Sequence, residues 1–115
     1  MTTNDPALRS TSVVAAGTTQ ATATVITHRF ATVADGITLG AGVVLTEANC
    51  NNFGWGTIAN GELAAGASES GASLLVYPWS GASFNGQAAD TPLNLEAGKT
   101  CMWVYMSSTQ IQVIG

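Results

Sequence analysis

Short stretches of β-branched residues recur along the chain, with glycine, asparagine, aspartate and serine between them. This alternation is typical of short strands joined by tight turns. Asp35-Gly36, Asn60-Gly61 and Asn85-Gly86 tolerate the positive φ of two-residue hairpin turns, and Gly98 in EAGKT predicts another turn. The predicted strands lie in STSVVAA, QATATVITHRFATVA, GITLGAGVVLT, WGTIA, SLLVYP, ASFN, PLNL, TCMWVYM and TQIQVI.

No helix is predicted, because Gly66 and Gly71 interrupt the helix formers of NGELAAGASESGAS, which is interpreted as a loop. The 115 residues fit one domain. We therefore expect an all-β, single-domain β-sandwich over residues 8–115, with a jelly roll as one form of it, and a flexible amino-terminal arm over residues 1–7.

Hydrophobic alternation assigns faces to the last predicted strands. PLNL and TQIQVI alternate apolar and polar residues, so each has one face in water. CMWVYM is apolar on both faces, which indicates a strand covered on both sides. One cover is the core, and the other is either a second sheet or a neighbouring subunit, of which the subunit is favoured. One face carries Cys101, Trp103 and Tyr105, and the other carries Met102, Val104 and Met106.

Charged residues make up only 9% of the chain, against roughly 25% in typical soluble domains. A surface with so few charges is expected to be covered by a partner or by further copies of the chain. The net charge is −4, and the three basic residues Arg9, Arg29 and Lys99 are dispersed. Binding to nucleic acid or to an anionic membrane is therefore not expected.

Membrane insertion is not expected either, because no stretch approaches the roughly 20 apolar residues of a span. The opening residues MTTNDPALRS lack the apolar segment of a signal peptide. The protein is accordingly expected to be made in a cytoplasm and to stay there or leave on lysis.

The residues capable of catalysis or metal binding form no recognisable constellation. His28 has no nucleophile or orienting acid at a related spacing, and an enzyme would need it to converge with an acid in a cleft. The seven acids are scattered, which gives neither a glycosidase pair nor a calcium loop. Cys50 and Cys101 are predicted to be free, with Cys101 in the core and Cys50 exposed. No catalytic, cofactor or metal residue is assigned, and the chain is not expected to be an enzyme.

The tryptophans offer the main alternative. Trp55, between two glycines, and Trp79, after Pro78, could stack on sugar rings if they are exposed. Packing in a core or an interface is the favoured interpretation for them, and Trp103 is assigned to the core.

The segment VYPWSGASFNGQAADTPLNLEAGKTCMWVYMSSTQIQVIG resembles the carboxy-terminal half of small β-rich virion proteins of tailed bacteriophages, and AAGTTQATATVIT resembles their amino-terminal part. The resemblance lies in a strand ending in Tyr-Pro, the following Ser-Gly-Ala, an Asn-Gly turn, an alternating strand ending at Ala-Gly-Lys and two final strands. The matching residues are Tyr77, Pro78, Ser80, Gly81, Ala82, Asn85, Gly86, Leu93, Leu95, Ala97, Gly98 and Lys99.

This resemblance implies a structural protein that decorates the outer surface of a capsid, as a homotrimer bound to the major capsid protein and made in the host cytoplasm. Head-fibre or tail-associated relatives are the alternative, with Trp55 and Trp79 as glycan contacts. The arm, Met1 to Arg9, is expected either to grip the capsid or to be a disordered terminus. The candidate subunit or capsid contacts are Leu8, Arg9, Met102, Val104, Met106, Ile111 and Val113.

Overall fold

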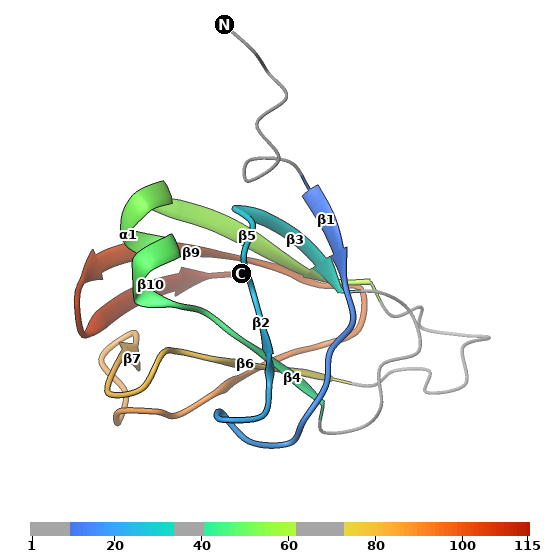
Figure 1. Ribbon diagram of the computed structural model, residues 1–115, viewed down its shortest axis with the longest axis horizontal. Helices are drawn as coiled ribbons and strands as arrows, with labels where there is room; N and C mark the ends of the chain where they lie inside the picture. Colours follow the sequence, from blue (N-terminus) through green and yellow to red (C-terminus); the bar gives the residue numbers. More distant parts are fainter. Residues whose placement is uncertain (1–9, 34–40, 62–72) are drawn as a thin grey trace, which may run out of the picture.

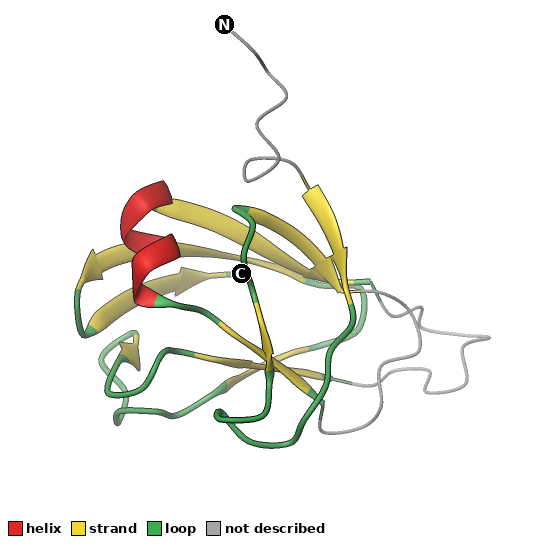
Figure 2. Cartoon of the chain, in the orientation of Figure 1, coloured by secondary structure: helices red, strands yellow, loops and turns green. Residues whose placement is uncertain are grey.

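Two β-sheets form the framework of the computed structural model, which describes residues 10–33, 41–61 and 73–115 (Figures 1 and 2). In these residues sheet A has the strand order β1-β3-β5-β9-β10-β7 and sheet B the order β2-β4-β6-β8. The elements are β1 (Ser10–Val13), β2 (Thr24–Val25), β3 (Phe30–Val33), β4 (Gly42–Val44), α1 (Glu47–Phe53), β5 (Trp55–Asn60), β6 (Leu74–Tyr77), β7 (Ser83–Phe84), β8 (Leu93–Leu95), β9 (Thr100–Ser107) and β10 (Gln110–Ile114).

The chain alternates between the two sheets along most of its length. β1, β3 and β5 run parallel to one another in sheet A, and β2, β4 and β6 do the same in sheet B. β7 and β8 continue the alternation, and β9 and β10 then follow each other within sheet A as an antiparallel hairpin. The connections before β9 therefore cross between layers, as the path of the ribbon in Figure 1 shows. The described chain is thus mostly β, with two mixed sheets.

Two of the predicted turns exist, but they do not close hairpins. Asn85 and Gly86 have φ values of 51° and 75°, and the Gln87 N–H donates to the Phe84 carbonyl at 2.9 Å. This turn leads from β7 in sheet A towards β8 in sheet B. Gly98, with φ of 76°, likewise turns the chain from β8 into β9 in the other sheet. Asp35-Gly36 lies outside the described residues.

The prediction of a tight turn at Asn60-Gly61 is wrong. Asn60 is the last residue of β5 and is buried, and its side-chain amide donates to the Leu95 carbonyl at 2.8 Å. Its backbone N–H donates to the Lys99 carbonyl, and its carbonyl accepts from the Gly98 N–H. Asn60 therefore fastens the end of β5 to the turn between β8 and β9, a role that requires an amide rather than a positive φ.

Both sheets contribute buried side chains to one core. Trp103, predicted to be core, is buried at the centre of β9. Gly56, its register partner on β5, leaves room for the indole, since a Cβ at Gly56 would collide with the Trp103 ring. The core also contains Val33, Ile58, Phe84 and Ile111 from sheet A and Val43, Leu74, Val76 and Leu95 from sheet B.

The expectation of a chain without helices is wrong, because Glu47–Phe53 form the helix α1. Thr46 caps the helix by accepting the Asn49 N–H on its hydroxyl, and Gly54, with φ of 84°, ends it by donating to the Cys50 carbonyl. Cys50 points into the core, so its predicted exposure is also wrong. The physical reason is that a seven-residue helix turns this side chain inward from an otherwise polar segment.

The predicted faces of the final strands are confirmed. Leu95 is buried while Asn94 is exposed, and Ile111 is buried while Gln110 and Gln112 are exposed. The arm over residues 1–7, together with Leu8 and Arg9, lies outside the described residues, as does most of the predicted loop NGELAAGASESGAS.

Candidate interaction surface

The face of sheet A that points away from the core is predominantly apolar. We call it the outer face, and strand register defines it. Trp55 lies opposite Val104, Thr57 opposite Met102, and Met102 opposite Ile114. Since side chains alternate along strands, the outer face comprises Phe30 and Thr32 of β3, Trp55, Thr57 and Ala59 of β5, Thr100, Met102, Val104 and Met106 of β9, and Gln112 and Ile114 of β10.

Several large apolar side chains of the outer face are in contact with solvent. Met106 is 61% exposed, Ile114 56% and Trp55 40%. None of the outer-face residues is charged. Sheet B packs on the other side of sheet A, so the second cover predicted for the Met102–Val104–Met106 face is not sheet B.

The candidate contact residues divide between the two sides of sheet A. Met102, Val104 and Met106 lie on the outer face, as the alternation predicted. Ile111 is buried in the core, and Val113 packs partly buried against it. Ile111 and Val113 therefore lie on the interior side of sheet A, where Ile111 is buried and Val113 is partly buried.

Arg29 lies at the edge of the outer face and stacks on Trp55. Its guanidinium carbon is 4.1 Å from the centre of the indole and 5.3 Å from that of the Phe30 ring. Phe30 and Trp55 themselves meet edge to face at 5.7 Å. The Arg29 Nε–H donates to the Trp55 carbonyl at 3.0 Å, and the Arg29 carbonyl accepts from the Thr57 N–H. Backbone and side chain of Arg29 are thus both held by β5.

Trp79 occupies a different environment. Its ring stacks on Tyr105 at 6.0 Å, and its indole N–H donates to the Ser108 carbonyl at 2.8 Å. The Tyr105 hydroxyl donates in turn to Glu47 at 2.8 Å, and this hydrogen bond to a carboxylate raises the pKa of Tyr105. The series connects the segment after β6, the β9–β10 hairpin and α1, which indicates a structural role for Trp79.

The two tryptophans considered for glycan binding do not share a surface. Trp55 lies on the outer face, whereas Trp79 stacks on Tyr105, whose side chain alternates onto the core side of β9. One face of the Trp55 ring is covered by Arg29. The two tryptophans therefore do not form a paired platform for a sugar.

A polar cluster around Asp90 stabilises the loops between β6 and β8. The Asp90 carboxylate accepts from the Gly81 N–H at 2.7 Å and from the Gln20 amide at 3.0 Å. These hydrogen bonds, first that of Gly81, lower the pKa of Asp90. Gln20 also donates to the Pro78 carbonyl at 2.8 Å. Asp90 and Gln20 thus link the segment after β6 to the loop before β8 and to the loop before β2.

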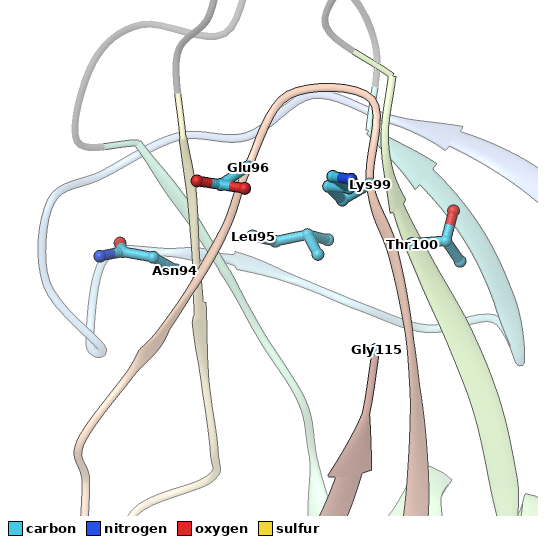
Figure 3. Close-up of a pocket in the computed structure, with 6 residues that line it drawn as sticks. All are labelled: Asn94, Leu95, Glu96, Lys99, Thr100 and Gly115. Carbon is cyan, nitrogen blue, oxygen red and sulfur yellow. The ribbon is translucent and has the colours of Figure 1, made fainter.

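An open hollow of about 480 Å³ lies at the end of β8 and the start of β9 (Figure 3). Leu95 is the one buried residue in its wall, and the others are exposed. Glu96 and Lys99 belong to the turn between the strands and form no ion pair with each other within the described chain. The lining residues are Asn94, Leu95, Glu96, Lys99, Thr100 and Gly115.

The residues considered for chemistry remain apart. His28 meets the hydroxyl of Thr27 at 3.0 Å, and Cys50 and Cys101 are both free and buried. In residues 10–33, 41–61 and 73–115 no three histidine, cysteine or acidic side chains are placed to hold a metal ion. No helix in this part of the chain has the length and apolar character to cross a bilayer.

The sequence pattern does not predict that Arg29, Phe30 and Ile114 belong to this surface. The position of Arg29 over Trp55 depends on the pairing of β3 with β5, which local sequence does not reveal. Comparison with known proteins gives no assignment: no family model, curated protein or solved structure matches the chain.

Proposed function

We propose that this protein is a structural virion component that decorates and stabilises the outer surface of a bacteriophage capsid as a homotrimer. The observation that supports this function best is the uncharged outer face, on which Trp55, Met106 and Ile114 are exposed. Apolar area removed from water contributes about 25 cal/mol per Å² before the costs of association. A contact of this kind, repeated over many copies, would stabilise a shell without any catalytic group.

The fold suits this function as a rigid β-sandwich, which we propose as the finer description of the two mixed sheets. The shared core supports it. A jelly roll is not part of the proposal, since its strands are antiparallel, whereas five of the eight strand pairings in the described residues are parallel.

Sedimentation velocity of the purified protein tests the self-association. The sedimentation coefficient of the wild type is expected to correspond to a mass of about 35 kDa, that of three 11.7 kDa chains. Met106→Glu and Ile114→Glu are expected to sediment as monomers, because each places a charge in the buried contact. Val25→Glu is the matched control: Val25 is also exposed, but on β2 of sheet B, and this variant should remain trimeric. A monomeric wild type would contradict the proposal.

The capsid assignment requires a separate experiment. Mass spectrometry and electron microscopy of purified particles should find the chain on the outside of the shell, and removing it should lower the temperature at which the particles release their DNA. A lone monomer without affinity for any shell would overturn the assignment.

Glycan binding in host attachment is the alternative function, and the exposure of Trp55 is the observation in its favour. Under that function, Trp55→Ala would lower adsorption to host cells and leave particle stability unchanged. Under the proposed function, Trp55→Ala would instead weaken assembly.

A further inference from the structure

We infer that the trimer is joined head to tail, with Arg29 of one copy bound to Glu96 of the next. This inference rests on the proposed function, because it takes the outer face as the contact between copies. It adds the identity of the charged pair and the geometry of the joint, neither of which follows from an apolar face alone.

The guanidinium of Arg29 is preorganised to bind a carboxylate. Stacking on Trp55 and the hydrogen bond from Nε fix the guanidinium, so little side-chain entropy remains to be lost on binding. The two terminal nitrogens can form a paired contact with a carboxylate. Within the described residues no carboxylate pairs with Arg29. An arginine beside an exposed tryptophan is also the composition typical of residues that dominate binding energy.

The acids of the described residues differ in what they already bind. The Glu47 carboxylate accepts from Tyr105, and the Asp90 carboxylate accepts from Gly81 and Gln20. Glu96 is exposed on the turn between β8 and β9. Its backbone carbonyl accepts from the Lys99 N–H at 3.0 Å, whereas its carboxylate forms no hydrogen bond or ion pair within the described chain. It is therefore the described acid that complements Arg29 at no cost to an existing contact.

The positions of Arg29 and Glu96 favour a closed ring of three copies. Trp55 begins β5, and the other end of β5 is bound to the β8–β9 turn through Asn60 and Gly98. Arg29 and Glu96 thus lie near opposite ends of one strand, about 17 Å apart along it at 3.4 Å per residue. A pair of this kind cannot form within one copy. Between copies it gives a head-to-tail contact, which closes into a ring when the rotation fits.

The hollow beside Glu96 provides space for the partner's aromatic side chain. Its wall includes Leu95, an apolar residue, and Glu96 lies on its rim (Figure 3). Trp55 of the next copy, with Arg29 stacked on its ring, would enter this hollow past Glu96. Lys99 lies on the same turn and repels Arg29, so the joint should tighten when Lys99 is neutralised.

Reversal of the charges tests the pair. Arg29→Glu and Glu96→Arg are each expected to weaken trimer formation at least tenfold in sedimentation equilibrium. The double variant is expected to associate at least tenfold more tightly than either single variant, and Lys99→Gln severalfold more tightly than the wild type. Circular dichroism verifies folding, and Arg29→Gln with Glu96→Gln replaces the reversed pair if a reversed variant is unfolded: their effects should be non-additive.

The outcomes separate this inference from the proposed function. Single variants without effect, or a double variant no tighter than the weaker single variant, would overturn the Arg29–Glu96 joint. If Met106→Glu and Ile114→Glu still abolish the trimer in that case, the outer face remains the contact and only the joint is wrong. If those two variants also leave association unchanged, the proposed function fails as well.

Discussion

The two cysteines are separated from solvent by the same core. Desolvation raises the pKa of Cys50 to about 12 and that of Cys101 to about 11, from an ordinary value of 9.0. Because the thiolate is the reactive form, both thiols should resist a disulfide reagent such as DTNB at pH 8. Two thiols per chain should react once the protein is unfolded in guanidinium chloride. Rapid labelling of the native protein would contradict the burial of these residues.

The same pKa shifts give a direction to the pH dependence of stability. A pKa raised in the folded state favours folding while the thiol is protonated in both states, below about pH 9. The stabilisation is lost as the pH rises towards 11 and 12. The melting temperature is therefore expected to fall over this range.

Among the described polar residues, Asn60 is expected to contribute most to the free energy of unfolding. Asn60→Ala would leave the Leu95 carbonyl without its donor inside the protein and should lower the free energy of unfolding by about 1–3 kcal/mol. Asn94→Ala, on an exposed position of β8, should change it by less than about 0.5 kcal/mol. Urea denaturation measures both, and equal effects would contradict the anchoring role.

At the level of elements, the stability of the short helix α1 depends on its N-terminal cap, Thr46. Thr46→Ala removes the hydroxyl that accepts the Asn49 N–H and should destabilise the protein by about 0.5–2 kcal/mol. Thr46→Ser keeps the hydroxyl and serves as the control. If thermal unfolding does not distinguish the two variants, the cap contributes nothing.

Most of the strands could be predicted from the sequence, but only part of their arrangement could. Alternation in PLNL, TQIQVI and CMWVYM predicted the faces correctly, because burial on one side of a sheet leaves a period of two. The sequence carries start and end signals of α1 at Thr46 and Gly54, but a single inward residue, Cys50, shows no helical period that would predict a helix between them. Glycine turns predicted bends and could not reveal that the chain changes sheets at them.

At the level of the whole molecule, the parallel pairings bring together residues that are distant in sequence. Phe30, Trp55 and Val104 become neighbours on the outer face only after β3, β5 and β9 have paired. The candidate surface was therefore predictable on β9, where alternation is local, and not at Arg29 or Ile114.

Deletion of residues 1–7 tests the proposed arm. The shortened chain is expected to keep its trimer, because the outer face is unchanged, and to bind capsids more weakly. Cosedimentation with shells that lack the protein measures the difference, and the full-length chain is the control. Undiminished binding would show that the arm does not hold the capsid.

The separate surroundings of the three tryptophans make the molecule its own fluorescent reporter. Trp103 is sealed in the core, whereas Trp55 is open to dissolved quenchers and has the positive Arg29 beside it. Iodide should therefore quench Trp55 preferentially, and shielding of Trp55 on assembly should reduce that quenching. Occupancy of the outer face can then be followed in solution without attaching any label.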